Sequence, residues 1–198
     1  MKHYLDITLL PDAEVSLGFL WQKIFQQVHI ALADNKVGAN KSAVGLSIVH
    51  YGDNAFPLGD KLRLLAIDEA ALVSLNIAQW LSRLRDYCHI TSIKSVPDNI
   101  EIYACFKRKP VKSLANKAKR RAAHLNKPYD EVLAYLQQEN NSKNCQLPFI
   151  TVESQQTKQL GHAQYQFPLF IEQTLSRQAV AGVFDCYGLA KTATVPWF

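Results

Sequence analysis

The stretch HYLDITLL at residues 3–10, followed by SLGFLWQKIFQQVHIAL at residues 16–32, decides the fold. In the first part every second residue from Leu5 to Leu9 is apolar, which predicts a half-buried strand that stops at Pro11. In the second part apolar residues recur every three or four positions. This spacing predicts an amphipathic helix with Ser16 as its N-cap.

The next segments extend this opening into a familiar order. In a strand expected at residues 61–66, Leu62 and Leu64 face inward and Arg63 faces outward. The elements run strand, helix, strand, strand, helix, strand, which is the order of a ferredoxin-like domain. The first strand and the first helix are followed by a strand at 44–49, the strand at 61–66, a helix from Asp68 to Leu84 with Asp68 as N-cap, and a strand at 89–96.

A second set of elements follows Pro97. They are a strand at 100–106, a basic helix at 113–125, a helix opening at Pro128, and strands at 149–153, 166–172 and 183–187. We therefore expect an α+β protein with two domains. Residues 1–97 form the ferredoxin-like (βαββαβ) domain, and residues 98–198 form a smaller C-terminal α+β domain with an arginine- and lysine-rich helix at about 112–125.

Positive charge is concentrated in one segment. The chain carries a net charge of +5, yet the nine Lys and Arg residues between Lys107 and Lys127 have no acidic residue among them. A charged helix is often only a solvated face. Here uncompensated like charges at four-residue spacing would destabilise the helix, so a polyanionic partner such as a nucleic acid is favoured.

The cysteines and the N-terminus indicate the compartment. The four cysteines lack CxxC spacing, and the first residues lack the long apolar core of a signal peptide. The sequence contains no run of 18 apolar residues, so we expect no membrane span. We expect a reduced, cytoplasmic protein that has no membrane partner and binds no metal or other cofactor.

The candidate chemistry rests on histidine. The sequence contains no phosphate-binding glycine loop, no zinc helix and no carboxylate cluster for a two-metal nuclease. RNA can instead be cut by its own ribose 2′-OH when a base removes the hydroxyl proton, and histidine suits that role. His29 lies at the edge of the first helix's apolar stripe. Its pattern alone favours a core-edge histidine with a satisfied hydrogen bond, and composition does not select it among six histidines.

Several segments resemble one family. The opening His3–Ile7, the segment Leu147–Thr151 running into Ser154-Gln155, the basic helix beginning Lys112-Ser113, and the closing Cys186–Leu189 with Val195–Phe198 all resemble it. The family is the CRISPR repeat-processing endoribonuclease of type I-F systems. The resemblance spans nearly the whole chain.

The resemblance implies a substrate and a reaction. It implies that the basic helix enters the major groove of a CRISPR repeat RNA hairpin. It also implies cleavage at the 3′ base of that hairpin, without metal, leaving a cyclic phosphate. The enzyme would then stay bound to its product among the other subunits of the type I-F surveillance complex.

The resemblance also assigns roles to individual residues. His29 matches the catalytic histidine, Ser154 a serine that positions the 2′-OH, and Tyr187 a tyrosine that supports the histidine. Arg108 matches an arginine that reads a guanine, and Phe167 an aromatic that stacks on the terminal base pair. The expected RNA-binding set is Arg108, Lys112, Asn116, Lys117, Lys119, Arg120, Arg121, His124 and Phe167.

The chain departs from the family pattern at several positions. Pro110 replaces a glutamine beyond the base-reading arginine, and Gln156 replaces a second serine. His124 and Leu125 stand where the family helix has two arginines, and the loop at 158–164 is longer, so Tyr165 competes with Phe167 for the stacking role. These changes indicate a different repeat sequence more than a different reaction.

Two other functions fit the same sequence. One is a non-catalytic subunit that binds the RNA hairpin in the same complex. The other is a metal-dependent nuclease or a DNA-binding regulator on the same scaffold.

Overall fold

The structure, a computed structural model, describes residues 1–198 except 11, 111–113, 141–146 and 155–165, and it leaves undescribed the side chains at 114–116 and 139–140. The chain is mixed α+β with two antiparallel sheets. It divides into two compact units, Met1–Arg108 with Pro148–Phe198, and Lys109–Leu147. These units group residues by contact, so the domain boundary expected at Pro97 stays a prediction.

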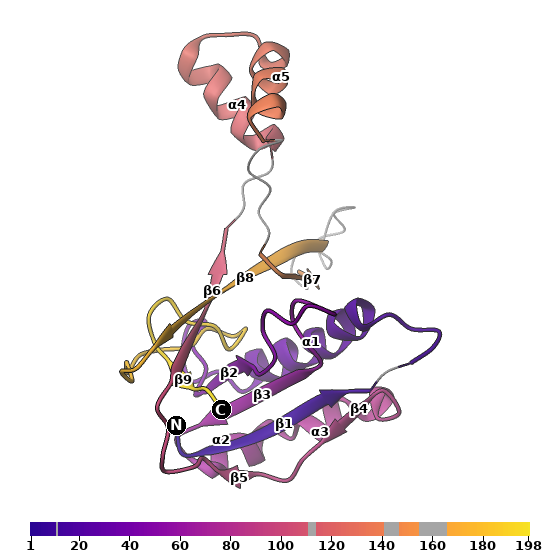
Figure 1. The fold of residues 1–198 in the computed structure, drawn as a ribbon, viewed down its shortest axis with the longest axis vertical. Helices are drawn as coiled ribbons and strands as arrows, with labels where there is room; N and C mark the ends of the chain where they lie inside the picture. Colours follow the sequence, from indigo (N-terminus) through magenta and orange to yellow (C-terminus); the bar gives the residue numbers. More distant parts are fainter. Residues whose placement is uncertain (11, 111–113, 141–146, 155–165) are drawn as a thin grey trace. The chain divides into compact units, whose positions relative to one another are not determined.

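The first sheet is built around the strand that opens the chain (Figure 1). Its members are β1 (His3–Leu9), β2 (Val44–Ile48), β3 (Lys61–Ala66), β4 (Cys88–Ile90) and β5 (Lys94–Ser95). The order is β2-β3-β1-β4, all neighbours are antiparallel, and β5 extends the pairing of β1. Leu5, Ile7 and Leu9 are buried, as the alternation predicted.

The first helix, α1 (Leu17–Asp34), matches its prediction. Ser16 is its N-cap, and its hydroxyl oxygen accepts from the Phe19 backbone N–H at 3.4 Å. Trp21, Ile24, Phe25 and Val28 are fully buried on its inner face. The helix therefore fixes the direction in which His29, one residue beyond Val28, leaves the core.

The single helix predicted from Asp68 to Leu84 is wrong. The chain forms α2 (Glu69–Leu75), α3 (Ile77–Trp80) and a 3-10 turn, η1 (Ser82–Leu84). The break lies at Asn76, whose φ of 43° is left-handed and cannot continue an α-helix. Asp68 occupies the N-cap position, but its side chain makes no capping hydrogen bond. Because α1 packs on α3 and both α1 and α2 contact β1, these helices cover one face of the sheet.

The strand predicted at 89–96 is interrupted. The interruption follows Ile90, where the Thr91 hydroxyl oxygen accepts from the Asp6 backbone N–H at 3.0 Å. A side chain thus takes a donor that a regular ladder would give to backbone. Pairing with β1 resumes only at Lys94.

The prediction that Arg63 faces solvent is also wrong. Only 6 % of Arg63 is exposed. Its Nε and Nη2 donate to the Asp6 carboxylate at 2.7 and 3.0 Å, and its guanidinium lies 3.9 Å from the Phe198 ring centroid and 4.5 Å from that of Tyr4. The last residues of the chain cover the face that local alternation assigned to water.

The second sheet is built from β6 (Tyr103–Lys109), β7 (Phe149–Glu153), β8 (Gln166–Ser176) and β9 (Val195–Pro196). Its order is β7-β8-β6-β9. Buried residues of both sheets, including Ile7 and Ile150, belong to one hydrophobic core. The strand predicted at 183–187 is wrong, because only Phe184 forms an isolated bridge, with Ser42.

The basic helix predicted at 113–125 is present as α4 (Leu114–Leu125), and α5 (Tyr129–Asn140) follows it. Ala118 and Ala122 of α4 bury against Val132 and Leu136 of α5 in a small core of their own. Among the described residues, no helix is both long enough and apolar enough to span a bilayer.

Candidate active site

His29 and Tyr187 meet although they lie far apart in the sequence. Their rings are stacked, with centroids 3.9 Å apart and planes inclined by 6°. The Nδ1 of His29 lies 2.9 Å from the Cys186 backbone oxygen. A carbonyl oxygen only accepts, so Nδ1 carries the proton of this bond and the neutral ring presents a lone pair at Nε2. The geometry thus selects the tautomer that can act as a base.

The surroundings of His29 keep its ring neutral. Burial is the largest effect and lowers the pKa of His29 below its usual value, whereas the bond to Cys186 and the charge of Asp185 act in the opposite direction. Burial also favours the neutral form of Tyr187, because it raises the pKa of that hydroxyl. Both rings are therefore uncharged near neutral pH.

A tight turn from Asp185 to Gly188 holds both partners of His29. One carboxylate oxygen of Asp185 accepts from the backbone N–H groups of Tyr187, at 2.8 Å, and Leu189, at 3.0 Å. Gly188 has a φ of 72°, and a Cβ there would lie 3.1 Å from a Leu46 side-chain atom. Glycine is therefore required both by the backbone conformation and by the close contact. This turn replaces the end of the predicted strand, because Asp185 takes the N–H groups that strand pairing would use.

Two further predicted site residues join this pair. The Arg108 guanidinium lies 5.3 Å from the Phe167 ring centroid and 6.0 Å from that of Tyr187. Arg108 is exposed near the end of β6, and Phe167 is half-buried in β8. We call the five residues the His29 cluster; they are His29, Arg108, Phe167, Asp185 and Tyr187.

Ser154 follows directly after β7, where the sheet is bonded to α1. The buried Gln26 side chain accepts from the Glu153 backbone N–H at 2.8 Å and donates to the Glu153 carbonyl at 3.3 Å. Gln26 precedes His29 by three residues on the helix, so the two lie on adjacent parts of its surface. Ser154 is thereby attached to a backbone unit held by the helical turn before His29.

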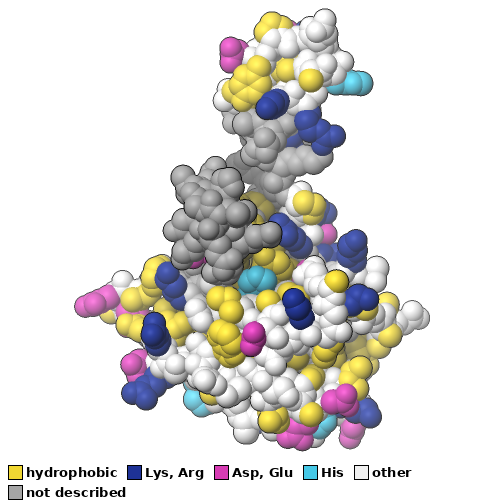
Figure 2. Space-filling model, turned by 180° about the vertical axis from the view of Figure 1, so that it is seen from behind, with side chains coloured by type: hydrophobic (Ala, Val, Ile, Leu, Met, Phe, Trp, Pro, Cys, Tyr) yellow, Lys and Arg dark blue, Asp and Glu magenta, His cyan; other side chains and the backbone are white. Residues whose placement is uncertain are grey.

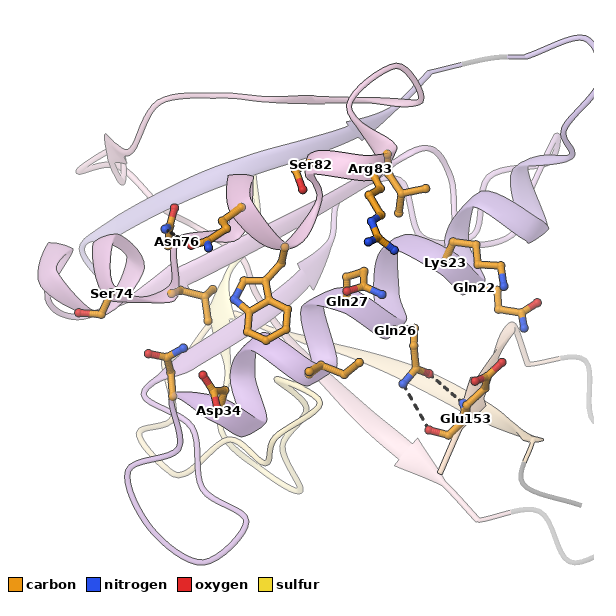
Figure 3. A pocket seen from close by; sticks show the side chains of 16 residues that line it. Gln22, Lys23, Gln26, Gln27, Asp34, Ser74, Asn76, Ser82, Arg83 and Glu153 are labelled. Carbon is orange, nitrogen blue, oxygen red and sulfur yellow. Dashed lines mark hydrogen bonds between the residues drawn. The ribbon is translucent and has the colours of Figure 1, made fainter. Parts of the chain in front are cut away.

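Gln26 and Glu153 also line a polar groove of about 870 Å³ (Figure 3). Side chains of α1 and of the segment from α2 to η1 line it, and no residue of the His29 cluster does. Figure 3 shows the bonded pair Gln26 and Glu153 at one end, away from Ser74 and Asn76. The stacked rings of His29 and Tyr187 therefore do not line the groove, although Gln26 and Glu153, which hold the chain next to Ser154, do.

The predicted RNA-binding residues of α4 belong to the other compact unit. Lys and Arg side chains are visible on the surface of the α4–α5 unit in Figure 2. The Arg121 guanidinium lies 5.1 Å from the Tyr135 ring centroid, which holds it against α5. On α4, the exposed residues of the predicted set are Lys117, Lys119, Arg120, Arg121 and His124.

Some predictions fall outside the described residues. These are Lys112, Gln156, Tyr165 and the 158–164 loop, as well as the side chain of Asn116. Within the described part of the chain, no group of three or more His, Cys, Asp or Glu side chains is arranged to hold a metal ion.

Asp185 and Gln26 were not identified from the sequence as site residues. The order Asp-x-Tyr-Gly at 185–188 could have indicated a side-chain-bonded turn, because aspartate often accepts from the backbone two residues ahead. Gln26 carries no such signal, since its partner lies 127 residues away.

Comparison with known proteins identifies the family of the chain. Residues 4–198 match the family model described as CRISPR-associated protein (Cas_Csy4). Two curated relatives, each named CRISPR-associated endonuclease Cas6/Csy4, are 32 % identical to the chain over its full length and theirs. One is from Escherichia coli (strain UTI89 / UPEC), the other from Pseudomonas aeruginosa (strain UCBPP-PA14). The chain therefore belongs to the Csy4 family of CRISPR-associated proteins.

Proposed function

We propose that this protein is an endoribonuclease that cleaves precursor CRISPR RNA at the 3′ base of the repeat hairpin, without a metal ion. The observation that carries the proposal is the geometry of His29, whose Nδ1 lies 2.9 Å from the Cys186 carbonyl oxygen and whose ring is stacked on Tyr187. The relatives' name, CRISPR-associated endonuclease, supports the same activity.

The chemistry follows from the lone pair at Nε2 of His29. In this mechanism Nε2 takes the proton of the ribose 2′-OH, and the 2′ oxygen attacks the adjacent phosphorus. The bond from phosphorus to the 5′ oxygen of the next nucleotide breaks, that oxygen takes a proton from water, and Nε2 returns its proton to water. The upstream product then ends in a 2′,3′-cyclic phosphate. Ser154 orients the 2′-OH, and Tyr187 holds the plane of the imidazole.

The remaining parts of the chain have distinct roles in the proposal. The strand order β2-β3-β1-β4, with its helices on one face, supports a ferredoxin-like arrangement for the first sheet. Arg108 and Phe167 read and stack on the base of the hairpin, and the exposed cations of α4 bind its phosphates. The enzyme then remains on its product as a subunit of the surveillance complex in the cytoplasm.

Single-turnover cleavage of repeat RNA by His29→Ala tests the mechanism. We expect the rate to fall by about 10²–10⁴-fold, as is typical when a general base is removed. His89→Ala is the matched control, because His89 is exposed on β4 and should leave the rate unchanged. Wild-type cleavage should persist in chelator and stop when the scissile ribose carries a 2′-deoxy group.

Three outcomes would contradict the proposal. An unchanged rate in His29→Ala would remove His29 from the mechanism. Loss of activity in chelator would indicate metal-dependent cleavage. Tight binding of the hairpin by the wild-type protein, with no cut product, would indicate a purely structural RNA-binding subunit.

A further inference from the structure

We infer that Asp185 is a positioning residue for the cleavage reaction, which holds both contacts of His29 in place and stabilises the protonated imidazole. The inference rests on the proposed function for its catalytic consequence. Its physical basis is the geometry of the turn from Asp185 to Gly188 and can be measured without RNA.

The first step concerns position. The Asp185 carboxylate accepts the N–H of Tyr187, whose ring stacks on His29, and the N–H of Leu189. The backbone closes the same turn twice, because the Gly188 N–H donates to the Asp185 carbonyl and the Asp185 N–H donates to the Leu189 carbonyl, both at 2.8 Å. Cys186, whose carbonyl accepts from His29, lies within this turn. One side chain thus fixes both the hydrogen-bonding and the stacking partner of the imidazole.

The second step concerns charge. Asp185 is the one charged group in the described part of the chain whose field is found to raise the pKa of His29. The Cys186 thiol and the Tyr187 hydroxyl are neutral near pH 7, since burial raises the pKa of each. Two cations oppose this effect of burial. Arg108, in β6, lowers the pKa of the Asp185 carboxyl and that of Tyr187, and Lys36, which follows α1, lowers the pKa of Cys186. The negative charge of Asp185 therefore opposes the lowering of the His29 pKa that burial causes.

The catalytic consequence follows from these two steps. When His29 takes the 2′-OH proton it becomes a partly buried cation, which is costly unless an anion lies near. Asp185 supplies that anion without touching the substrate. Burial raises the pKa of the Asp185 carboxyl, whereas the hydrogen bonds from Leu189 and Tyr187 and the charges of His29 and Arg108 act in the opposite direction and favour its charged form.

Asp185→Asn separates charge from geometry, because an amide oxygen still accepts both N–H groups but carries no charge. We expect the acid limb of the single-turnover rate to move to lower pH and the plateau rate to fall roughly tenfold, less than the 10²–10⁴-fold that a general acid or base itself contributes, because His29 remains in place. Asp12→Asn is the matched control. Asp12 also accepts two backbone N–H groups on one oxygen, at 2.8 Å each, but on an exposed turn.

The decisive measurement is an NMR titration of the His29 ring in the free protein, assigned with His29→Ala. Asp185→Asn should titrate at lower pH than wild type. This holds whether or not the protein cuts RNA, so a failure of the proposed function is distinguishable. An unshifted His29 titration in Asp185→Asn would overturn the inference, as would a slower rate with an unmoved acid limb. If Asp185→Asn does not fold, Asp185→Ser retains an acceptor and serves for the same titration.

Discussion

At the scale of single residues, Tyr187 contributes a ring. Within the described residues its hydroxyl makes no hydrogen bond, whereas its ring lies flat on His29 and 6.4 Å from the Phe25 ring centroid. The imidazole is thus placed by ring contact and by the Cys186 carbonyl. Support for the base is expected to depend on the shape of the side chain at 187 and not on its polarity.

Two substitutions separate these contributions. Tyr187→Phe keeps the ring and is expected to cleave within about threefold of wild type, a change below 1 kcal/mol in barrier. Tyr187→Leu removes the ring, and we expect a loss of up to about 10²-fold, as misplacement of a catalytic group by about 1 Å costs. Single-turnover rates at saturating protein make the comparison. An equally large loss in Tyr187→Phe and Tyr187→Leu would assign the role to the hydroxyl, which both variants lack.

At the scale of elements, α1 supports two parts of the site. It carries His29 and, through Gln26, holds the end of β7 next to Ser154. Gln26 is 8 % exposed, so its amide has little access to water as an alternative partner. The helix and the strand are therefore expected to lose their mutual alignment together when this amide is removed.

Gln26→Leu tests this alignment. It leaves the Glu153 backbone groups without their side-chain partner, and we expect a loss of about 1–3 kcal/mol in the free energy of unfolding. Cleavage should slow while hairpin affinity remains, because the substitution alters the support of Ser154 and no proposed RNA contact. Urea unfolding and single-turnover rates measure the two effects. Gln27→Leu, on the same helix, is the control, and a Gln26→Leu rate equal to the control's would contradict this role.

The elements also mark how far sequence reasoning reached. Local periodicity was sufficient for the apolar faces of β1 and α1, but it did not predict that Asp6, on the other face of β1, is also buried. It failed where a distant contact overrides local preference, as at Thr91, which bonds to Asp6, and at Arg63, which the last residues of the chain cover. The left-handed Asn76 broke a helix whose apolar spacing was otherwise regular.

The site was less predictable than the fold for the same reason. His29 and Cys186 are 157 residues apart, and no periodic pattern connects them. His29, Tyr187, Arg108 and Phe167 were named through family resemblance, and the structure places these four together. Asp185 was not identified as a site residue, because residues 183–187 were predicted to form a strand and not a turn.

At the scale of the whole molecule, the residues proposed to cut the RNA and those proposed to bind its phosphates belong to different compact units. The His29 cluster lies in the unit that holds both sheets, whereas the exposed cations of α4 lie in Lys109–Leu147. Each unit has its own core. Changes in α4 are therefore expected to alter RNA affinity without disturbing the chemistry.

The salt dependence of binding tests this separation. Removing one cation that binds a phosphate should reduce the slope of log affinity against log salt by about one, so Arg120→Ala with Arg121→Ala should reduce it by about two. The rate at saturating protein should stay within about threefold of wild type. Lys127→Ala is the matched control, because Lys127 is already paired with Glu131 at 2.6 Å and should change the slope little. An unchanged slope in the double variant would show that these arginines do not bind phosphates. A large fall in the cleavage rate at saturating protein would show that phosphate binding by α4 and cleavage are not separable.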